Sequence, residues 1–274
     1  MTRRLRLDAE LVRRGLARSR EQAVGLVQQG RVTVGGMVAR KPSTAVETAA
    51  ALVVLPAGDD APPDYASRGA YKLAGALADF GGPAVAGRRC LDAGASTGGF
   101  TDVLLRAGAS EVVAVDVGYG QLAWRLQQDQ RVVVRDRTNV RELTADLTGG
   151  PVDLVVSDLS FISLRLALPA LAVVCRPDGD IVCMVKPQFE VGKERLGRGG
   201  VVRDPGLRAA AVLDVATAAH DLGWGTHAVT ASTLPGPSGN VEYFCWLRSD
   251  APAPSADAID AAVAAGPTGE RVSR

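Results

Sequence analysis

The chain has 274 residues, of which 47% are hydrophobic and 22% charged, with a net charge of +1. This composition is that of an ordinary folded protein with one sizeable core and a small second domain, and it confines disorder to the ends. The N-terminus lacks the basic start and apolar core of a signal peptide, and no apolar run approaches the roughly 18 residues of a membrane span. We therefore expect a cytoplasmic protein that does not bind a membrane.

The cysteines form no C-x-x-C pair, and the only histidines, His220 and His227, do not complete the spacing of a structural zinc site. Each cysteine stands in an apolar run, which is typical of a small buried side chain. We predict no metal and no redox role for the four cysteines, which are Cys90, Cys175, Cys183 and Cys245.

The small net charge hides a strong asymmetry along the chain. Residues 1–41 hold ten Arg and Lys against three acids, a local charge of +7, so the remaining 233 residues carry −6. Such a basic block is typical of a module that binds phosphates, although a solvated basic face has the same composition.

The N-terminal residues predict a helix pair followed by a small sheet. Apolar side chains recur at helical spacing over residues 5–29, and Gly15 and Ser19 stand where one helix would end and the next begin. After Gly30 the pattern alternates, turns at Gly35-Gly36, and resumes in an apolar run over residues 51–55.

The stretch RLDAELVRRGLARSREQAVGLVQQGRVTVGGMVARKP, residues 6–42, resembles the S4-type RNA-binding domain. The resemblance implies that a set of basic side chains on one face binds RNA phosphates by shape: Arg6, Arg18, Arg20, Arg31 and Lys41. To these predicted RNA-binding residues we add Arg3 and Arg4 at the start of the basic block, and Arg68 between the two domains.

Composition also suggests the domain boundaries. Residues 56–66 are rich in Pro, Gly and Asp, as linkers are. We predict an RNA-binding domain at 1–60, a linker at 61–69, a catalytic domain at 70–250, and a disordered tail at 251–274 with at most one helical turn near residues 259–263.

Residues 70–250 alternate strand-like runs with helical patterns, which predicts an α/β fold with a doubly wound, largely parallel sheet that finishes in an antiparallel hairpin. Ligands of such sheets bind beyond the carboxyl ends of the strands. The predicted strands are 89–93, 112–117, 132–135, 152–158, 180–186, 229–232 and 243–247.

A glycine-rich turn follows the first of these strands in CLDAGASTGGFT. Its G-x-x-x-G-G spacing differs from the dinucleotide fingerprint and from the P-loop, and glycines there let the backbone approach a ligand. Asp116 ends the next strand, where it could accept hydrogen bonds from ribose hydroxyls or merely cap a helix. Asp136 and Asn139 follow the third strand and suit an adenine edge.

Together these features predict an S-adenosylmethionine site. Phe161 and Ser238 would line its methionine end or the substrate opening. The predicted cofactor-binding residues are Asp92, Gly94, Ala95, Ser96, Thr97, Gly98, Gly99, Asp116, Val117, Asp136, Asn139, Asp158 and Phe161.

Four polar residues fall where the fold would aim them at one place: Lys72, Asp158, Lys186 and Glu242. Lys186 ends an apolar strand before Pro187, so partial desolvation would suit it to act as a base or to orient a hydroxyl. The other interpretation is a lysine whose ammonium reaches solvent.

The order and spacing of these four residues resemble the K-D-K-E tetrad of the FtsJ-like ribose 2′-O-methyltransferases. With the S4-type start, residues 3–248 resemble the haemolysin-A-like (TlyA) family of rRNA cytidine 2′-O-methyltransferases. The motifs that carry the resemblance are SRGAYKL, LDAGASTGGFTD, DVGYGQL, DRTNVR, SDLSFISL, VKPQFE and PGPSGNVEYF.

The resemblance implies methylation of a cytidine ribose in 16S rRNA, 23S rRNA or both, on which sensitivity to capreomycin-type antibiotics depends. The partners would be the 30S and 50S ribosomal subunits, and the protein would be a monomer. Three alternatives remain at this point: an RNA-binding assembly factor without methyl transfer, a pore-forming haemolysin, and a nucleotide-dependent dehydrogenase.

Overall fold

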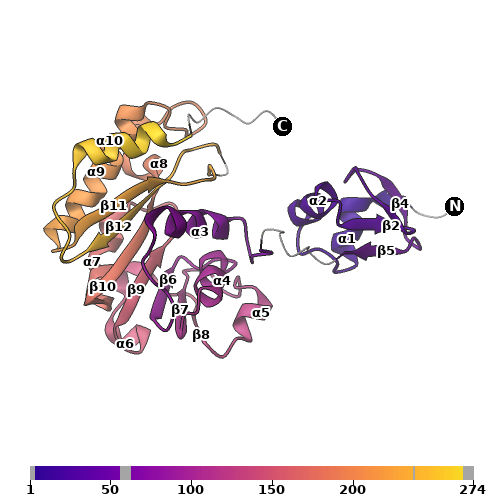
Figure 1. Cartoon of the computed structure of the whole chain (residues 1–274), viewed down its shortest axis with the longest axis horizontal. Coiled ribbons are helices and arrows are strands. Elements are labelled where there is room, and N and C mark those ends of the chain that lie inside the picture. The colour runs from indigo at the N-terminus through magenta and orange to yellow at the C-terminus, as the bar shows by residue number, and fades with distance from the viewer. Residues whose placement is uncertain (1–3, 56–62, 237, 268–274) are drawn as a thin grey trace. The chain divides into compact units, whose positions relative to one another are not determined.

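The computed structural model describes residues 4–55, 63–236 and 238–267. It divides into two compact units, residues 1–64 and 65–274, each with its own core (Figure 1). Arg3, most of the Pro- and Gly-rich stretch 56–66 and the last residues of the predicted tail lie outside the described residues.

The first unit is a helix pair against short antiparallel strands, as the sequence predicts. Ser19 caps the second helix, where its Oγ accepts the N–H of Gln22 at 3.1 Å, and Gly15 adopts a positive φ of 71° beyond the first. Its elements are β1 (Arg4–Arg6), α1 (Leu7–Arg13), α2 (Arg20–Gln28), β2 (Val32–Val34), β3 (Met37–Val38), β4 (Ala45–Glu47) and β5 (Leu52–Val54).

The strands of this unit form two small sheets. β2 pairs with both β3 and β5, and Leu7, Leu11 and Leu26 of the helices are buried with Val32 of β2. Strand β1, which pairs with β4, was not predicted, because three residues next to a helix are too few to show alternation.

The second unit is a seven-stranded sheet between helical layers (Figure 1). Its strands are β6 (Arg89–Ala93), β7 (Glu111–Val115), β8 (Val132–Arg135), β9 (Val152–Ser157), β10 (Cys175–Val185), β11 (Gly225–Ala231) and β12 (Tyr243–Arg248). Its α-helices are α3 (Gly69–Phe80), α4 (Gly99–Arg106), α5 (Trp124–Gln127), α6 (Ala145–Thr148), α7 (Leu164–Val174), α8 (Pro187–Glu190), α9 (Pro205–Asp221) and α10 (Ala256–Ala265), and two 3-10 turns are η1 (Val140–Glu142) and η2 (Lys193–Arg195).

The sheet has the order β11-β12-β10-β9-β6-β7-β8, in which only the pairs made by β12 are antiparallel. The predicted α/β fold with a terminal hairpin is thus confirmed. Alternate side chains of β10 face opposite layers: Cys183 packs toward α7 and α9, and Met184 packs toward α3 and α4.

The prediction of a disordered tail is wrong for residues 256–265, which form α10. The Oγ of Ser255 caps this helix at the N–H of Ala258, and Ile259 and Val263 are buried in the same core as α9. The single helical turn predicted near residues 259–263 is part of this longer helix, and its two apolar side chains, one turn apart, suffice to dock it.

All four cysteines are buried. Among the described residues, no helix is long and apolar enough to cross a bilayer, and no group of three or more His, Cys, Asp or Glu could hold a metal ion.

Candidate active site

Backbone strain gathers where the parallel strands end, which we call the carboxyl end of the sheet. Within the described chain the non-glycine residues with positive φ are Ser96 at 45°, Arg137 at 53° and Phe161 at 65°. Each follows a different strand, β6, β8 or β9, within a few residues of its end. Such conformations cost about 1–3 kcal/mol each and concentrate at functional sites. We therefore expect the functional site at this end of the sheet.

The glycine-rich turn after β6 packs tightly against the backbone that follows β9. Gly94 has a φ of 91°, and a Cβ atom built there would lie 2.7 Å from the carbonyl oxygen of Asp158. Gly98, at 92°, leads directly into α4. The turn is therefore a bare backbone cradle that only glycine can form at these positions.

The buried carboxylate of Asp92, at the end of β6, supports the glycine turn through hydrogen bonds to α4. Its Oδ2 accepts the backbone N–H of Thr101 at 2.8 Å and its hydroxyl at 2.7 Å, which ties the end of β6 to α4. The other oxygen, Oδ1, is buried without a hydrogen bond. Burial raises the pKa of Asp92 to about 7, although the bonds from Thr101 lower it.

Two further carboxylates lie beyond β7 and β8 and bind neighbouring backbone. Asp116 accepts the N–H of Ser96 at 2.8 Å and that of Gly118 at 2.7 Å, so it faces the glycine turn instead of capping a helix. Asp136 accepts the N–H of Gly120 at 2.9 Å. Each carboxylate keeps lone pairs that could accept ligand hydroxyls or amines.

The structure gives the other predicted cofactor residues different surroundings. Asn139 caps η1 by accepting the N–H of Arg141 at 3.1 Å, so its side chain serves the local fold. Val117 is exposed. Phe161 is 91% exposed, with its ring 5.3 Å from that of Phe189.

The four predicted catalytic residues form two ion pairs. Lys72 Nζ lies 2.5 Å from Glu242 Oε2, and Lys186 Nζ lies 2.6 Å from Asp158 Oδ1. Both lysines and Glu242 are buried. Neither lysine is therefore a surface side chain that extends into solvent.

Strand pairing brings these two ion pairs to the same place. Val185 pairs with Tyr243 across β10 and β12, so Lys186 and Glu242, the next residues on each strand, are neighbours. Asp158 follows β9 beside β10, and a Cβ on Gly69 at the start of α3 would lie 3.7 Å from its Oδ2. The glycine cradle and the four residues thus share the carboxyl end of the sheet.

Ser160 is a site residue that the sequence did not single out. Its hydroxyl lies 2.8 Å from Lys186 Nζ, which is therefore held by both Ser160 and Asp158. A signal was present in the D-x-S spacing of SDLSF, because the turn after a strand can return the second residue to the same side.

Several predicted RNA-binding side chains of the first unit are held by acids. Arg6 and Arg20 both contact the buried carboxylate of Asp8, at 2.8 Å and 3.2 Å. The hydrogen bond from Arg6 lowers the pKa of Asp8 to about 2. This shared partner places two guanidinium groups side by side on the surface.

The other basic residues vary in their contacts. Arg4 pairs with Glu47 and Arg18 with Asp64, while Arg31 donates to the carbonyl of Leu55. Lys41 is exposed, and in the second unit Arg68 is exposed at the N-terminus of α3.

Two family profiles match the chain. The S4 domain matches residues 5–50, and the FtsJ-like methyltransferase matches residues 65–249, with the glycine cradle and both ion pairs inside it. The chain belongs to the FtsJ-like methyltransferase family. As a member of that family with an S4 domain, it is a methyltransferase, and the resemblance to the TlyA family is confirmed.

Close relatives have both parts of the chain. The 16S/23S rRNA (cytidine-2'-O)-methyltransferase TlyA of Mycobacterium tuberculosis is 60% identical over 97% of this chain and 100% of its own length. YqxC of Bacillus subtilis is 42% identical over 89% of this chain and 85% of its own. A solved structure named as a putative hemolysin from Streptococcus thermophilus is 37% identical, with a TM-score of 0.72 over 96% of both chains.

Proposed function

We propose that this FtsJ-like methyltransferase transfers a methyl group from S-adenosylmethionine to the ribose 2′-hydroxyl of a cytidine in 16S rRNA, 23S rRNA or both. The observation that carries the proposal is the pair of buried ion pairs, Lys72 with Glu242 and Lys186 with Asp158, beside the glycine cradle. The reaction named for the 60% identical relative supports the same chemistry.

The cradle has the features that a nucleoside cofactor needs. Gly94 and Gly98 leave backbone without side chains for close approach, and Asp116 offers free lone pairs toward a ribose. Asp136 and the exposed face of Val117 would border the adenine. The residues present thus fit S-adenosylmethionine, which supplies an electrophilic methyl group when bound.

The geometry favours Lys186 as the group that orients the target oxygen. Asp158 balances the charge of its ammonium as an ion-pair partner, and Ser160 accepts one of its N–H bonds. A further N–H bond remains to donate to the ribose 2′-oxygen, so that a lone pair of this oxygen would be turned toward the methyl group. The oxygen–carbon bond would form as the carbon–sulfur bond of the donor breaks, and the hydroxyl proton would pass to solvent water. Alignment of this kind supplies most of the rate when the donor is already electrophilic.

Lys72 and Glu242 would hold the neighbouring wall of the site. Glu242 is 1% exposed, and a Cβ on Gly236 would lie 2.6 Å from its Oε1, so the backbone at Gly236 lies directly against this carboxylate. A buried carboxylate needs a cation, which Lys72 provides. The pair would fix the backbone at Gly236 beside the site.

The first unit would supply affinity for RNA. Its S4 domain and its positive charge are suited to phosphate contacts that recognise the shape of folded RNA. Action on 30S or 50S subunits would place the protein in the cytoplasm, and the capreomycin sensitivity implied by the family would depend on the methyl group and be lost without it.

The test is transfer of labelled methyl from S-adenosylmethionine to purified, unmethylated 30S and 50S subunits. The wild type, Lys186→Ala and a matched control, Lys193→Ala, are run together, because Lys193 is an exposed lysine outside both ion pairs. If the phosphodiester bond that follows the labelled cytidine resists alkaline hydrolysis, the label is in a ribose 2′-O-methyl group.

We expect incorporation with the wild type and with Lys193→Ala, and a loss of at least about 100-fold with Lys186→Ala. Incorporation into a base, or equal incorporation with Lys186→Ala, would contradict the proposed reaction. Tight RNA binding without incorporation into either subunit would favour the assembly factor.

A further inference from the structure

Three cationic side chains are buried among the residues that the structure describes: Lys72, Lys186 and Arg208. Lys72 and Lys186 each have a carboxylate partner within 2.6 Å. No described acid forms an ion pair with Arg208, which is 3% exposed. An arginine cannot lose its charge by deprotonation, and buried charges in proteins are almost always paired.

The guanidinium of Arg208 has N–H groups to spare. Its Nε donates to the carbonyl of Val202 at 2.9 Å, whereas Nη2 is buried and has no hydrogen-bond partner. The hydroxyl of Tyr243 is likewise buried without a hydrogen bond. Burial raises the pKa of Tyr243, whereas the charge of Arg208 and the approach of its N–H groups to the hydroxyl lower it, so the two side chains lie against each other without a hydrogen bond of ordinary geometry.

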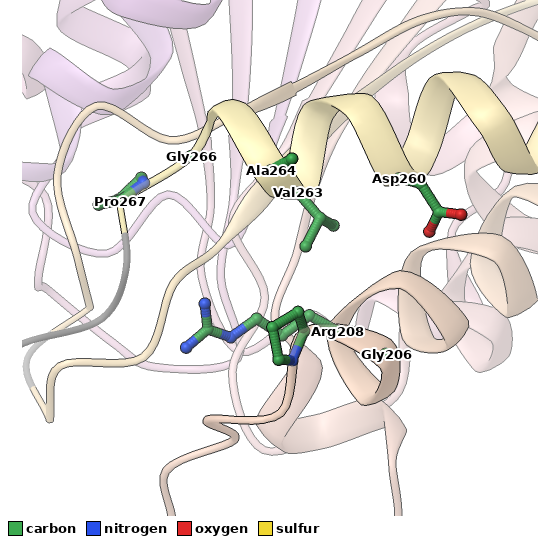
Figure 2. A pocket seen from close by; sticks show the side chains of 8 residues that line it. Gly206, Arg208, Asp260, Val263, Ala264, Gly266 and Pro267 are labelled. Atoms are coloured by element: carbon green, nitrogen blue, oxygen red, sulfur yellow. The ribbon is translucent and has the colours of Figure 1, made fainter.

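Arg208 borders a hollow between α9 and α10 of about 460 Å³ (Figure 2). Its walls include Pro205, Val263, Ala264 and Pro267, which are apolar, and Arg208 lies at its floor. Figure 2 shows the carboxylate of Asp260 on α10, away from the guanidinium. The hollow therefore combines one unpaired cation with mostly apolar walls.

The N-terminus of α9 is already occupied by the protein itself. Asp204 accepts the N–H groups of Gly206 and Leu207, at 2.8 Å and 3.4 Å. A ligand anion would therefore bind the guanidinium, which presents its N–H groups in a fork that matches a carboxylate.

We infer that the hollow between α9 and α10 is a binding site for a small monoanionic carboxylate with a short apolar body. The carboxylate would pair with Arg208, and its apolar part would lie against Val263 and the prolines. Asp260 on the rim disfavours a more highly charged anion such as phosphate. The site is independent of the methyl-transfer proposal, because none of the residues that line it belongs to the two ion pairs.

The probe is sodium butyrate, titrated into the full chain at constant ionic strength while thermal unfolding is followed. A ligand that binds only the folded state raises Tm in proportion to the logarithm of its concentration once the site is saturated. Acetate lacks two methylenes and should require about tenfold higher concentration. Butylammonium and inorganic phosphate are the charge controls.

Variants separate this site from general salt effects. Arg208→Met should abolish the butyrate shift, whereas Arg203→Met, an exposed arginine on the preceding loop, should keep it. Because Arg208→Met could fold poorly, Asp260→Asn provides a second test on an exposed side chain. Loss of this negative charge should lower the half-saturating butyrate concentration by about threefold.

The inference is overturned if butyrate produces no saturable rise in Tm, if butylammonium produces the same rise, or if Arg208→Met retains it. A larger rise with phosphate than with butyrate would overturn the assignment of an apolar monocarboxylate. An unchanged titration in Asp260→Asn would show that butyrate binds elsewhere.

Discussion

Lys186 is held by two oxygen atoms of different kinds, the carboxylate of Asp158 and the hydroxyl of Ser160. The carboxylate balances its charge, but one acceptor cannot fix the direction of the remaining N–H bonds. The hydroxyl supplies the second point that a defined orientation needs. Ser160 is thus a positioning residue in the proposed reaction, although it was not among the predicted catalytic residues.

Ser160→Ala should lower kcat about tenfold and leave the affinities for S-adenosylmethionine and RNA unchanged, because only the orientation of Lys186 is lost. Single-turnover methyl transfer with separate binding titrations measures both effects. Ser160→Thr, which keeps the hydroxyl at an exposed position, should restore most of the rate. A kcat equal to that of the wild type in Ser160→Ala would remove Ser160 from the mechanism.

Asp92 should make stability depend on pH. Burial, with smaller contributions from Asp158 and Asp116, raises its pKa, while Thr101 lowers it, and the result is about 7. Between about pH 4 and pH 7 the folded state holds a proton that the unfolded state has lost. The free energy of unfolding should therefore fall by up to about 1.4 kcal/mol per pH unit and level off above pH 7.

Asp92→Asn isolates this contribution. The amide oxygen can still accept both bonds from Thr101, and the amide cannot ionise. The free energy of unfolding of the wild type minus that of the variant, measured by urea denaturation from pH 4.5 to 8, should fall steadily as pH rises to 7, because only the wild type loses stability. A difference that stays constant over this range would mean that Asp92 is ionised throughout.

At the scale of elements, α10 depends on two side chains, Ile259 and Val263, which are 1% and 8% exposed. Ile259→Ala should destabilise the second unit by about 2–5 kcal/mol, because it leaves a cavity beside α9. Thermal unfolding measures the loss. Ala261→Ser on the exposed side of the same helix should cost only about 0.5 kcal/mol, and equal effects of the two substitutions would indicate that α10 is not docked.

The sheet could be predicted closely from the sequence because its strands are short, buried and rich in valine. β6 and β8 have the predicted bounds, whereas β10 begins at Cys175, five residues before the predicted start. The extra residues, Arg176 to Gly179, are polar or turn-forming and gave no strand signal. The docking of α10 against α9 was likewise not predicted, because composition does not show which face of a helix is covered.

The members of the candidate site could be predicted, but their pairing could not. Asp158 and Lys186 directly follow buried strands, Glu242 directly precedes one, and Lys72 lies in the first turn of α3, all of which local pattern reveals. The partnership of Lys72 with Glu242 joins residues 170 apart, so it depends on strand order and helix docking. Ser160 was missed for a similar reason, because its contact with Lys186 depends on how the turn after β9 folds.

At the scale of the whole molecule, positive charge is concentrated in the first unit and the proposed chemistry is in the second. RNA affinity and cofactor affinity should therefore respond to different substitutions. Lys41→Gln should weaken RNA binding and reduce the slope of log K against log salt by about 0.7–0.9, as expected for one lost phosphate contact. Binding titrations at several salt concentrations measure the slope.

Arg176→Gln is the matched control, because Arg176 pairs with Asp153 at the opposite end of β10 from Lys186. It should leave the slope unchanged, and neither substitution should alter the rise in Tm caused by S-adenosylhomocysteine. A similar change of slope in both variants would mean that RNA contacts are spread over both units.

The contact between Gly94 and the carbonyl of Asp158 joins parts of the site that kinetics would treat separately. A side chain at position 94 would push on the backbone that carries Asp158, and through that carboxylate on Lys186. A variant of the glycine turn would therefore impair both cofactor binding and the position of Lys186. Saturating concentrations of the cofactor would not restore its rate. In related sequences, substitutions in the glycine turn should therefore be accompanied by substitutions in the segment around Asp158, or both segments should be conserved.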